Sequence, residues 1–228
     1  MTSPVTPRPS AATPGAALVV LVALVTVAAV LAVTGRPAAA TRADAHADTP
    51  ASAPVRARIV FAKDAHHPFR SRVEWRAWRQ GPGGRWRLVD HAAWRAGSGF
   101  GGPATTDECV HDQGWLPDGH YSFVQYDDYR GNLIKGRVFF LGNKACRNGT
   151  VRTDLFIHTE TGAHNRPCAD RRGDQVCRWE YPRINDYRSH GCVKMAPQDL
   201  LALTRHYHRW FRPGVRYPTA RVQVVVRG

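Results

Sequence analysis

An uncharged apolar run from Gly15 to Gly35 divides this chain of 228 residues into a short N-terminal part and a long C-terminal part. The run has about 20 residues, which matches a helix that spans a bilayer, whereas the apolar region of a signal peptide usually has about 7–15 residues. Three alanines at positions 38–40 nevertheless offer a cleavage site directly after it. We therefore expect a cytoplasmic stub over residues 1–14 and one hydrophobic helix over residues 15–35, which acts as a signal anchor or a signal peptide.

The segment that follows, residues 36–56, consists mostly of alanine, proline and polar residues without an apolar period. Such a composition is typical of a flexible linker. Because a short N-terminal stub normally stays in the cytoplasm, the long C-terminal part should be exported. Residues 57–228 are expected to form one extracytoplasmic domain, either membrane-anchored or secreted to the cell wall.

The charge of the exported part limits its partners. The chain has 32 Lys and Arg against 18 Asp and Glu, a net charge of +14, and the first forty residues contain two arginines and no acid. The remainder therefore carries +12, which favours a polyanionic neighbour. Outside a membrane such neighbours are anionic lipid headgroups or anionic wall polymers, and the sequence contains no nucleic-acid-binding module. We expect wall polymers as partners, the membrane through the N-terminal helix if it is uncleaved, and no nucleic acid.

Five cysteines are an odd number for an exported domain, where cysteines tend to pair. Cys109, Cys146, Cys168 and Cys177 lie in polar, turn-rich stretches, whereas Cys192 lies in the segment RSHGCVKM. We therefore expect Cys192 to be the free thiol. Local spacing suggests the pairs Cys109 with Cys146 and Cys168 with Cys177, but the sequence does not exclude the two other pairings.

A zinc site is the competing interpretation for part of this set. His158, His164, Cys168 and Cys177 are the candidate ligands, but no short C-x2-C or H-x3-H pair supports them. We expect no metal and no cofactor.

The domain should be mainly β with one packed helix. With 20 Gly and 16 Pro the chain should contain many turns. Alternating apolar and polar residues over 73–79, a turn over 81–84 and an apolar segment over 86–89 predict a β-hairpin. Apolar residues at steps of three and four over 196–211 predict a helix that packs on the sheet, with a proline at an early position. Further strands are predicted over residues 121–126, 135–141, 154–158 and 221–226.

Cysteine chemistry needs a thiolate, a base within hydrogen-bond reach and donors for the developing oxyanion. The backbone amides of Gly191 and Cys192 directly precede the predicted helix, whose positive dipole should lower the pKa of the Cys192 thiol. His158 is the last residue of the apolar strand predicted over residues 154–158, and a side chain at that position can be held rigidly. His158 is therefore the preferred base.

These residues resemble the catalytic domain of the L,D-transpeptidases, the YkuD-type family. The family has a histidine that closes a strand and, after a variable loop, Ser-His-Gly-Cys with a β-branched residue. In this chain the two segments are Ile157-His158-Thr159 and Ser189-His190-Gly191-Cys192-Val193-Lys194, and Leu116-Pro117-Asp118-Gly119-His120-Tyr121 is similar to a Pro-x-Gly turn of the family. The resemblance covers residues 71–227 and implies a β-rich sandwich or barrel.

The resemblance implies a role for each motif residue. Cys192 would be the nucleophile, His158 the general base, and the carbonyl of Thr159 the group that orients the imidazole. His190 would be an accessory residue beside the site, while the amides of Gly191 and Cys192 hold the oxyanion.

Three further residues are implied in substrate binding, namely Ser189, Lys194 and Arg188. The chain departs from the family pattern at Thr159, where glycine is usual, and at Lys194, where arginine or asparagine is usual. The long loop between the two motifs, residues 159–188, could act as a lid if Cys168 and Cys177 close it.

The implied activity is that of an exported cysteine acyltransferase acting on peptidoglycan stem peptides through a thioester. Two alternatives stay open: an L,D-carboxypeptidase that uses water as the acceptor, and a non-catalytic, disulfide-braced module that binds the cell wall.

Overall fold

The structure is a computed structural model that describes residues 53–228. The predicted stub, the predicted hydrophobic helix and most of the predicted linker lie outside the described residues. Within residues 53–228, no helix is both long enough and apolar enough to span a membrane. The first strand begins at Val55, so the last two residues assigned to the linker belong to the domain.

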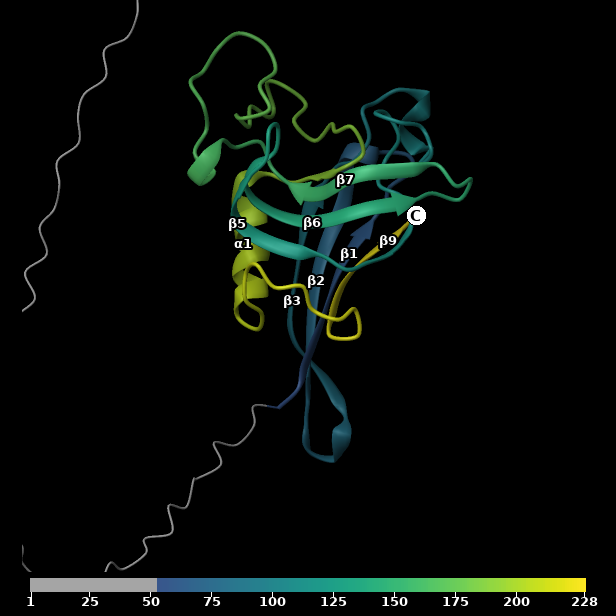
Figure 1. Ribbon diagram of the computed structural model, residues 1–228, viewed down its shortest axis with the longest axis vertical. Coiled ribbons are helices and arrows are strands. Elements are labelled where there is room, and N and C mark those ends of the chain that lie inside the picture. The colour runs from purple at the N-terminus through teal and green to yellow at the C-terminus, as the bar shows by residue number, and fades with distance from the viewer. Residues whose placement is uncertain (1–52) are drawn as a thin grey trace, which may run out of the picture. The chain divides into compact units, whose positions relative to one another are not determined.

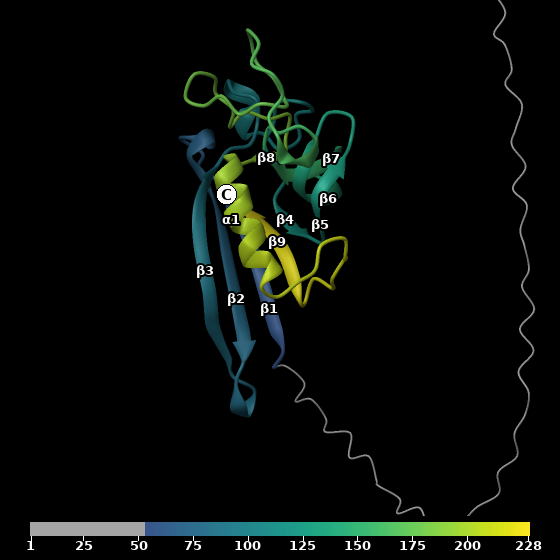
Figure 2. The same ribbon diagram turned by 90° about the vertical axis from the view of Figure 1, so that its left-hand side faces the viewer.

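The described residues form two β-sheets and one α-helix, as Figures 1 and 2 show. A five-stranded sheet, sheet A, has the order β3-β2-β1-β9-β4, and a four-stranded sheet, sheet B, has the order β5-β6-β7-β8. Short 3-10 helices cover Pro68–Arg70, Pro82–Gly84, Pro103–Thr106 and Ala163–Asn165. The larger elements are β1 (Val55–Ala62), β2 (Ser71–Gln80), β3 (Trp86–Ala96), β4 (Gly119–Tyr121), β5 (Val124–Arg130), β6 (Lys135–Ala145), β7 (Val151–His158), β8 (Val193–Lys194), α1 (Pro197–His208) and β9 (Val222–Arg227).

The mainly β fold with one packed helix is confirmed, as is the hairpin. Strands β2 and β3 pair antiparallel around the Gly-Pro-Gly-Gly turn, and their tip extends beyond the rest of the domain (Figure 1). The predicted strand over residues 121–126 is wrong as one element. Tyr121 ends β4 in sheet A, and Val124 begins β5 in sheet B. Phe123 is buried in the core between them, so the apolar alternation continues across the point where the chain changes sheets.

One core joins the two sheets and the helix. Leu200, Leu203 and Tyr207 of α1 are fully buried, at the three- and four-residue steps expected for a helix that packs on one face. The ring of Tyr207 lies 6.4 Å from Trp75 of sheet A and 5.6 Å from Phe139 of sheet B, both centroid distances in edge-on contacts. The helix therefore fixes the two sheets against each other.

Two disulfides brace the loops, and they are the pairs that local spacing suggested. Cys109 is bonded to Cys146, and Cys168 is bonded to Cys177, which leaves Cys192 as the free cysteine. Because both sulfurs of the second pair are in a disulfide, the alternative zinc site has lost two of its four ligands.

The two disulfides should differ in their contribution to stability. In the chain-entropy model a disulfide stabilises more when it closes a longer loop. The sequence separations are 37 and 9 residues. The variant Cys109→Ala/Cys146→Ala should therefore lose about 4 kcal/mol of unfolding free energy in urea, and Cys168→Ala/Cys177→Ala about 3 kcal/mol. A larger loss for the shorter loop would contradict this account.

Candidate active site

The pairing of β7 with β8 places His158 and Cys192 on one face of sheet B. These strands are parallel, with Ile157 opposite Val193 and His158 opposite Lys194. Ile157 and Val193 are fully buried in the core, so the alternating neighbours His158, Lys194 and Cys192 point to the opposite face. Adjacent strands lie about 4.8 Å apart and two residues span about 6.6 Å, so the Cα atoms of His158 and Cys192 are roughly 8 Å apart. Within residues 53–228 the two side chains are not hydrogen-bonded to each other, because the thiol of Cys192 donates to Asp154 instead.

The thiol of Cys192 is partly buried and points at the backbone of β7. Its sulfur donates to the carbonyl oxygen of Asp154 over 3.6 Å. Asp154 has a φ of 52°, in the left-handed region that Asp and Asn enter more readily than most residues. The backbone amide of Asp154 donates a hydrogen bond to the side-chain oxygen of Asn143 over 3.0 Å. A local irregularity of β7 thus supplies the acceptor for the thiol, and the sequence gives no sign of it.

Burial raises the pKa of the Cys192 thiol to about 11. The backbone amide of Phe156 and the charges of Lys194 and Arg152 oppose this rise, since all three favour a thiolate. The prediction of a lowered pKa is therefore wrong for this structure. Strand β8 follows Cys192 directly and α1 begins only at Pro197, so the thiol does not lie at the helix N-terminus.

His158 is buried, and its environment keeps the imidazole neutral. Its Nδ1 atom lies 3.1 Å from the carbonyl oxygen of Thr159, the group that the resemblance implied as its orienter. A neutral ring that donates from Nδ1 leaves Nε2 as an acceptor. Burial, followed by the nearby charge of Lys194, lowers the pKa of His158 to about 3. The ring is therefore in the form that a general base requires.

Lys194 is held inside the protein by an acidic cluster that the sequence analysis did not identify. Its ammonium pairs with the carboxylate of Glu160, and only 12% of its side chain is exposed. Oxygen atoms of Glu160, Asp174 and Asp186 lie within 4.8 Å of one another, so these three residues could share a cation. Burial raises the pKa of Glu160 to about 7, and Lys194 opposes that rise. The charge of Lys194 is thus already paired before any substrate binds.

The turn before Cys192 is closed by Ser189. Its hydroxyl donates to the carbonyl oxygen of Cys192, and its amide donates to Gly99 over 2.8 Å. The amide of Gly191 donates to the same hydroxyl oxygen over 3.4 Å. Ser189 is buried, so the structure gives it a role in shaping the turn and places its hydroxyl away from solvent.

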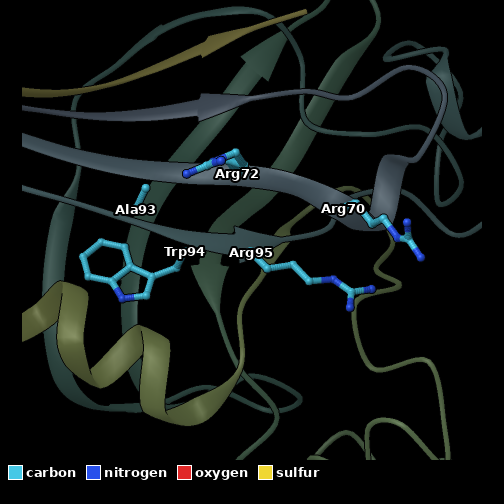
Figure 3. Close-up of a pocket in the computed structure, with 5 residues that line it drawn as sticks. All are labelled: Arg70, Arg72, Ala93, Trp94 and Arg95. Atoms are coloured by element: carbon cyan, nitrogen blue, oxygen red, sulfur yellow. The ribbon is translucent and has the colours of Figure 1, made fainter.

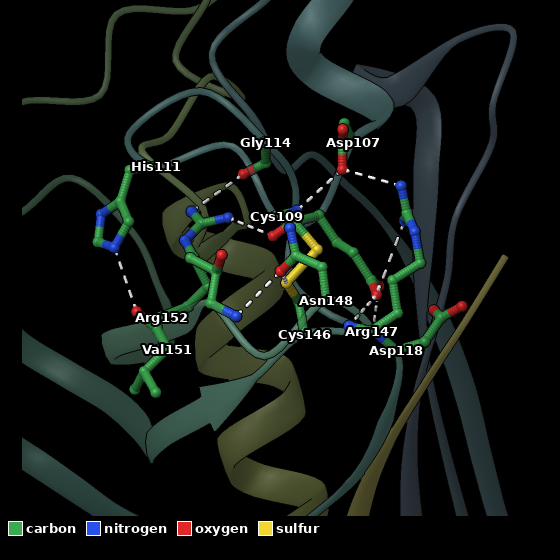
Figure 4. Close-up of a disulfide and its surroundings, with 12 residues drawn as sticks. Asp107, Cys109, His111, Gly114, Asp118, Cys146, Arg147, Asn148, Val151 and Arg152 are labelled. Atoms are coloured by element: carbon green, nitrogen blue, oxygen red, sulfur yellow. Dashed lines mark hydrogen bonds and ion pairs between the residues drawn. A yellow bond between two sulfur atoms is a disulfide. The ribbon is translucent and has the colours of Figure 1, made fainter.

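A buried arginine, Arg152, is hydrogen-bonded to this turn, and Figure 4 shows its bond to Gly114. The guanidinium of Arg152 donates to the carbonyl oxygens of Glu108 over 2.6 Å, His190 over 2.9 Å and Gly114 over 3.2 Å. Gly191 has a φ of 116°, and a Cβ atom there would lie 2.1 Å from Nη2 of Arg152. Only glycine fits this position. The sequence analysis missed Arg152, because an arginine within an alternating strand carries no sign that it is buried.

The remaining two predicted site residues are exposed. The imidazole of His190 stacks on Phe100 at 4.7 Å between centroids and donates from Nδ1 to the carbonyl of Asp112 over 2.9 Å. The guanidinium of Arg188 lies 5.7 Å from the ring centre of Phe69. Both side chains therefore stand outside the buried group formed around His158 and Cys192.

Two cavities in the described residues lie elsewhere. One of about 440 Å³ is lined by Arg70, Arg72, Ala93, Trp94 and Arg95, as Figure 3 shows, and one of about 410 Å³ lies in the loop over residues 170–184. Neither is lined by His158 or Cys192. Comparisons with family models, curated proteins and solved structures find no match for the chain.

Replacing Gly191 with alanine should damage the site more than a glycine with a similar backbone elsewhere. Gly149 also has a positive φ, 87°, but a Cβ atom there meets nothing within 4 Å. Gly149→Ala should cost only the left-handed strain, about 1–2 kcal/mol. Gly191→Ala must also displace Arg152 from buried carbonyls, for a total of about 3–5 kcal/mol. Urea unfolding of both variants measures the difference, and equal losses would show that Arg152 does not constrain the turn.

Proposed function

We propose that this protein is an exported cysteine acyltransferase that acts on peptidoglycan stem peptides, with the activity of an L,D-transpeptidase. The observation that carries the proposal is the free thiol of Cys192, within Ser-His-Gly-Cys, on the same sheet face as the buried neutral imidazole of His158. The two disulfides support an oxidising, extracytoplasmic location. The motif resemblance supplies the reaction class, a β-rich YkuD-like sandwich is the proposed fold family, and peptidoglycan is the proposed partner.

In the proposed reaction, the sulfur of Cys192 attacks the carbonyl carbon of an amide that joins an L-centre to a D-centre. The thiol proton passes to Nε2 of His158 while the C–S bond forms. The imidazolium then returns the proton to the leaving amine as the C–N bond breaks, which leaves a thioester. An acceptor amine attacks the thioester, loses a proton through His158 and regenerates the thiol.

The acidities of the two groups determine when the proton moves. With the thiol pKa near 11 and the imidazole pKa near 3, moving the proton from sulfur to the ring before attack would be strongly unfavourable. Proton transfer should therefore accompany C–S bond formation. The buried positive charge of Arg152, together with Lys194, favours the negative charge that develops on sulfur in that step.

The cation that binds a donor carboxylate should be Arg188. Lys194 is engaged with Glu160, whereas Arg188 is exposed and has no carboxylate partner among residues 53–228. In this proposal Lys194 acts on the electrostatics of His158 and Cys192, and its ammonium does not bind substrate directly.

An L,D-carboxypeptidase would use the same steps with water as the acceptor. A wall-binding module without catalysis is the second candidate, and the excess of positive charge favours it. In that case Cys192 would be buried without reacting, whereas an acyltransferase must form a covalent adduct with an acyl donor.

The test is acylation by a carbapenem, a strained acyl donor, followed by intact mass over pH 5–9. If neutral His158 accepts the proton from a neutral thiol, the rate should stay flat in this window, because the pKa values of about 3 and about 11 both lie outside it. In His158→Ala only thiolate can react, so the rate should fall at neutral pH and rise about tenfold per pH unit.

Three variants complete the experiment. Cys192→Ser should give no adduct, and His67→Ala, at an exposed histidine in another part of the domain, should react like the parent. Glu160→Gln removes a nearby carboxyl group whose pKa, about 7, lies inside the window, and it shows whether that group bends the pH profile. A parent rate that rises tenfold per unit throughout would reject His158 as the base, and no adduct at any pH would reject the acyltransferase.

A further inference from the structure

The outer face of sheet A is rich in arginine. The inward side chains of its strands, such as Ile59, Val73 and Val224, are fully buried in the core. Their neighbours therefore point to the other side of the sheet. We define the arginine face by the outward residues Arg58 (β1), Arg72 and Arg76 (β2), Arg95 (β3) and Arg227 (β9).

The strand register sets these arginines opposite one another. Arg58 is paired with Arg76, and Arg72 with Arg95. Arg227 lies in the same row as the second pair, because Ala62 pairs with both Arg72 and Arg227. Like charges that lie directly opposite across a strand pair destabilise a sheet. An anion bound at Arg58 or Arg72 would relieve this repulsion.

Few acids offset this charge. Glu74 is the one acid among the outward strand residues of this face, and its carboxylate pairs with Arg76 over 2.7 Å. Arg95 donates to the carbonyl of Phe69 over 2.7 Å and to the hydroxyl of Tyr181 over 2.8 Å, neither of which is charged. No ion pair within residues 53–228 involves Arg58, Arg72 or Arg227, so most of the positive charge is uncompensated.

One end of the face is hollowed. The cavity of about 440 Å³ is lined by Arg70, Arg72 and Arg95 among others (Figure 3). In that view the side chain of Arg95 extends toward Arg70, while Trp94 points toward the helix. Three arginines thus line a concave surface at this end of the face, and the flat rows lie beside it.

We propose that the arginine face binds a linear phosphodiester polymer, such as a polyol phosphate chain, along sheet A. The planar fork of arginine matches the two non-bridging oxygens of a phosphodiester, so Arg58 and Arg72 can each bind one phosphate. The row of Arg72 and the row of Arg58 lie four residues apart, or about 13 Å, so an extended chain can reach both. The proposal rests on the extracytoplasmic location but not on the acyl transfer chemistry.

An anionic membrane fits this face less well. Among the exposed large apolar residues of the described domain, Tyr181 contacts Arg95 and Leu88 lies on β3, but none is an outward residue of the two arginine rows. A surface that docks on a bilayer normally adds apolar side chains that enter it. The charge therefore favours an extended polymer over a lipid surface.

The test compares two double variants of equal net charge in the full chain. Arg58→Gln/Arg72→Gln removes one arginine from each opposed pair, and Arg171→Gln/Arg172→Gln removes two exposed arginines from a distant loop. Binding to a synthetic glycerol phosphate oligomer at physiological salt should weaken about tenfold or more in the first variant and less than about twofold in the second. Both should keep the carbapenem acylation rate of the parent. Without polymer, the first variant should unfold at the same or a higher temperature, because it removes like-charge pairs.

Other results would overturn the proposal. Equal weakening in both variants would mean attraction by net charge without a site. Equal binding of polyglutamate and of the phosphate oligomer would remove the preference for phosphate. If Arg58→Gln/Arg72→Gln weakened binding to vesicles of phosphatidylcholine and phosphatidylglycerol but not to the phosphate oligomer, the face would be a membrane-binding surface. If the first variant does not fold, Arg72→Gln against Arg172→Gln gives the same comparison with one charge removed. If the parent protein bound the polymer but was not acylated by the carbapenem, only the proposed acyltransferase activity would be rejected.

Discussion

The guanidinium of Arg152 is the contact on which the candidate site depends. It is almost fully buried and donates to three main-chain carbonyls from different segments, at Glu108, Gly114 and His190. A buried charge is costly unless hydrogen bonds compensate it, so removing any of these acceptors should be strongly unfavourable. Gly191 has no Cβ atom and thereby leaves room for the guanidinium. One strand residue thus ties the turn before Cys192 to the loop that carries Cys109.

Other contacts fix both segments that Arg152 joins, the loop around Glu108 and the turn before Cys192. The disulfide from Cys109 to Cys146 closes the loop next to Glu108, and the carboxylate of Glu108 accepts the amides of Asp118 and Arg147 (Figure 4). At the other end, β8 is fixed by its pairing with β7 and by the ion pair of Lys194 with Glu160. The same positive groups that hold the turn also favour negative charge on the sulfur of Cys192. Positioning and electrostatics therefore come from the same residues.

Local patterns in the sequence predicted the hairpin, the helix and the free cysteine and suggested both disulfide pairs, because each depends on neighbours in the chain. Contacts between distant segments were not predictable in this way. The alternation from Tyr121 to Tyr126 does not reveal that the chain changes sheets there, and a strand arginine such as Arg152 looks solvent-exposed in a linear pattern. The sign of the Cys192 pKa shift was wrong because the prediction assumed a helix start at the thiol, while a short strand stands between them. Lys194 was expected to bind substrate because it is the nearest cation after Cys192, and its ion pair with Glu160, 34 residues earlier, is not visible in the sequence.

The central claim is that the sulfur of Cys192 takes the acyl group of a stem peptide. The most direct measurement is to mix the full chain with a stem tetrapeptide that ends in a D-residue, quench in acid, and map the modified peptide by mass while assaying the released D-amino acid. The account predicts a thioester on Cys192 that forms as the D-residue is released, decays when an acceptor amine is added, and is absent in Cys192→Ser. Release of the D-residue at an equal rate in Cys192→Ser, or an acyl group found only on other residues, would contradict it.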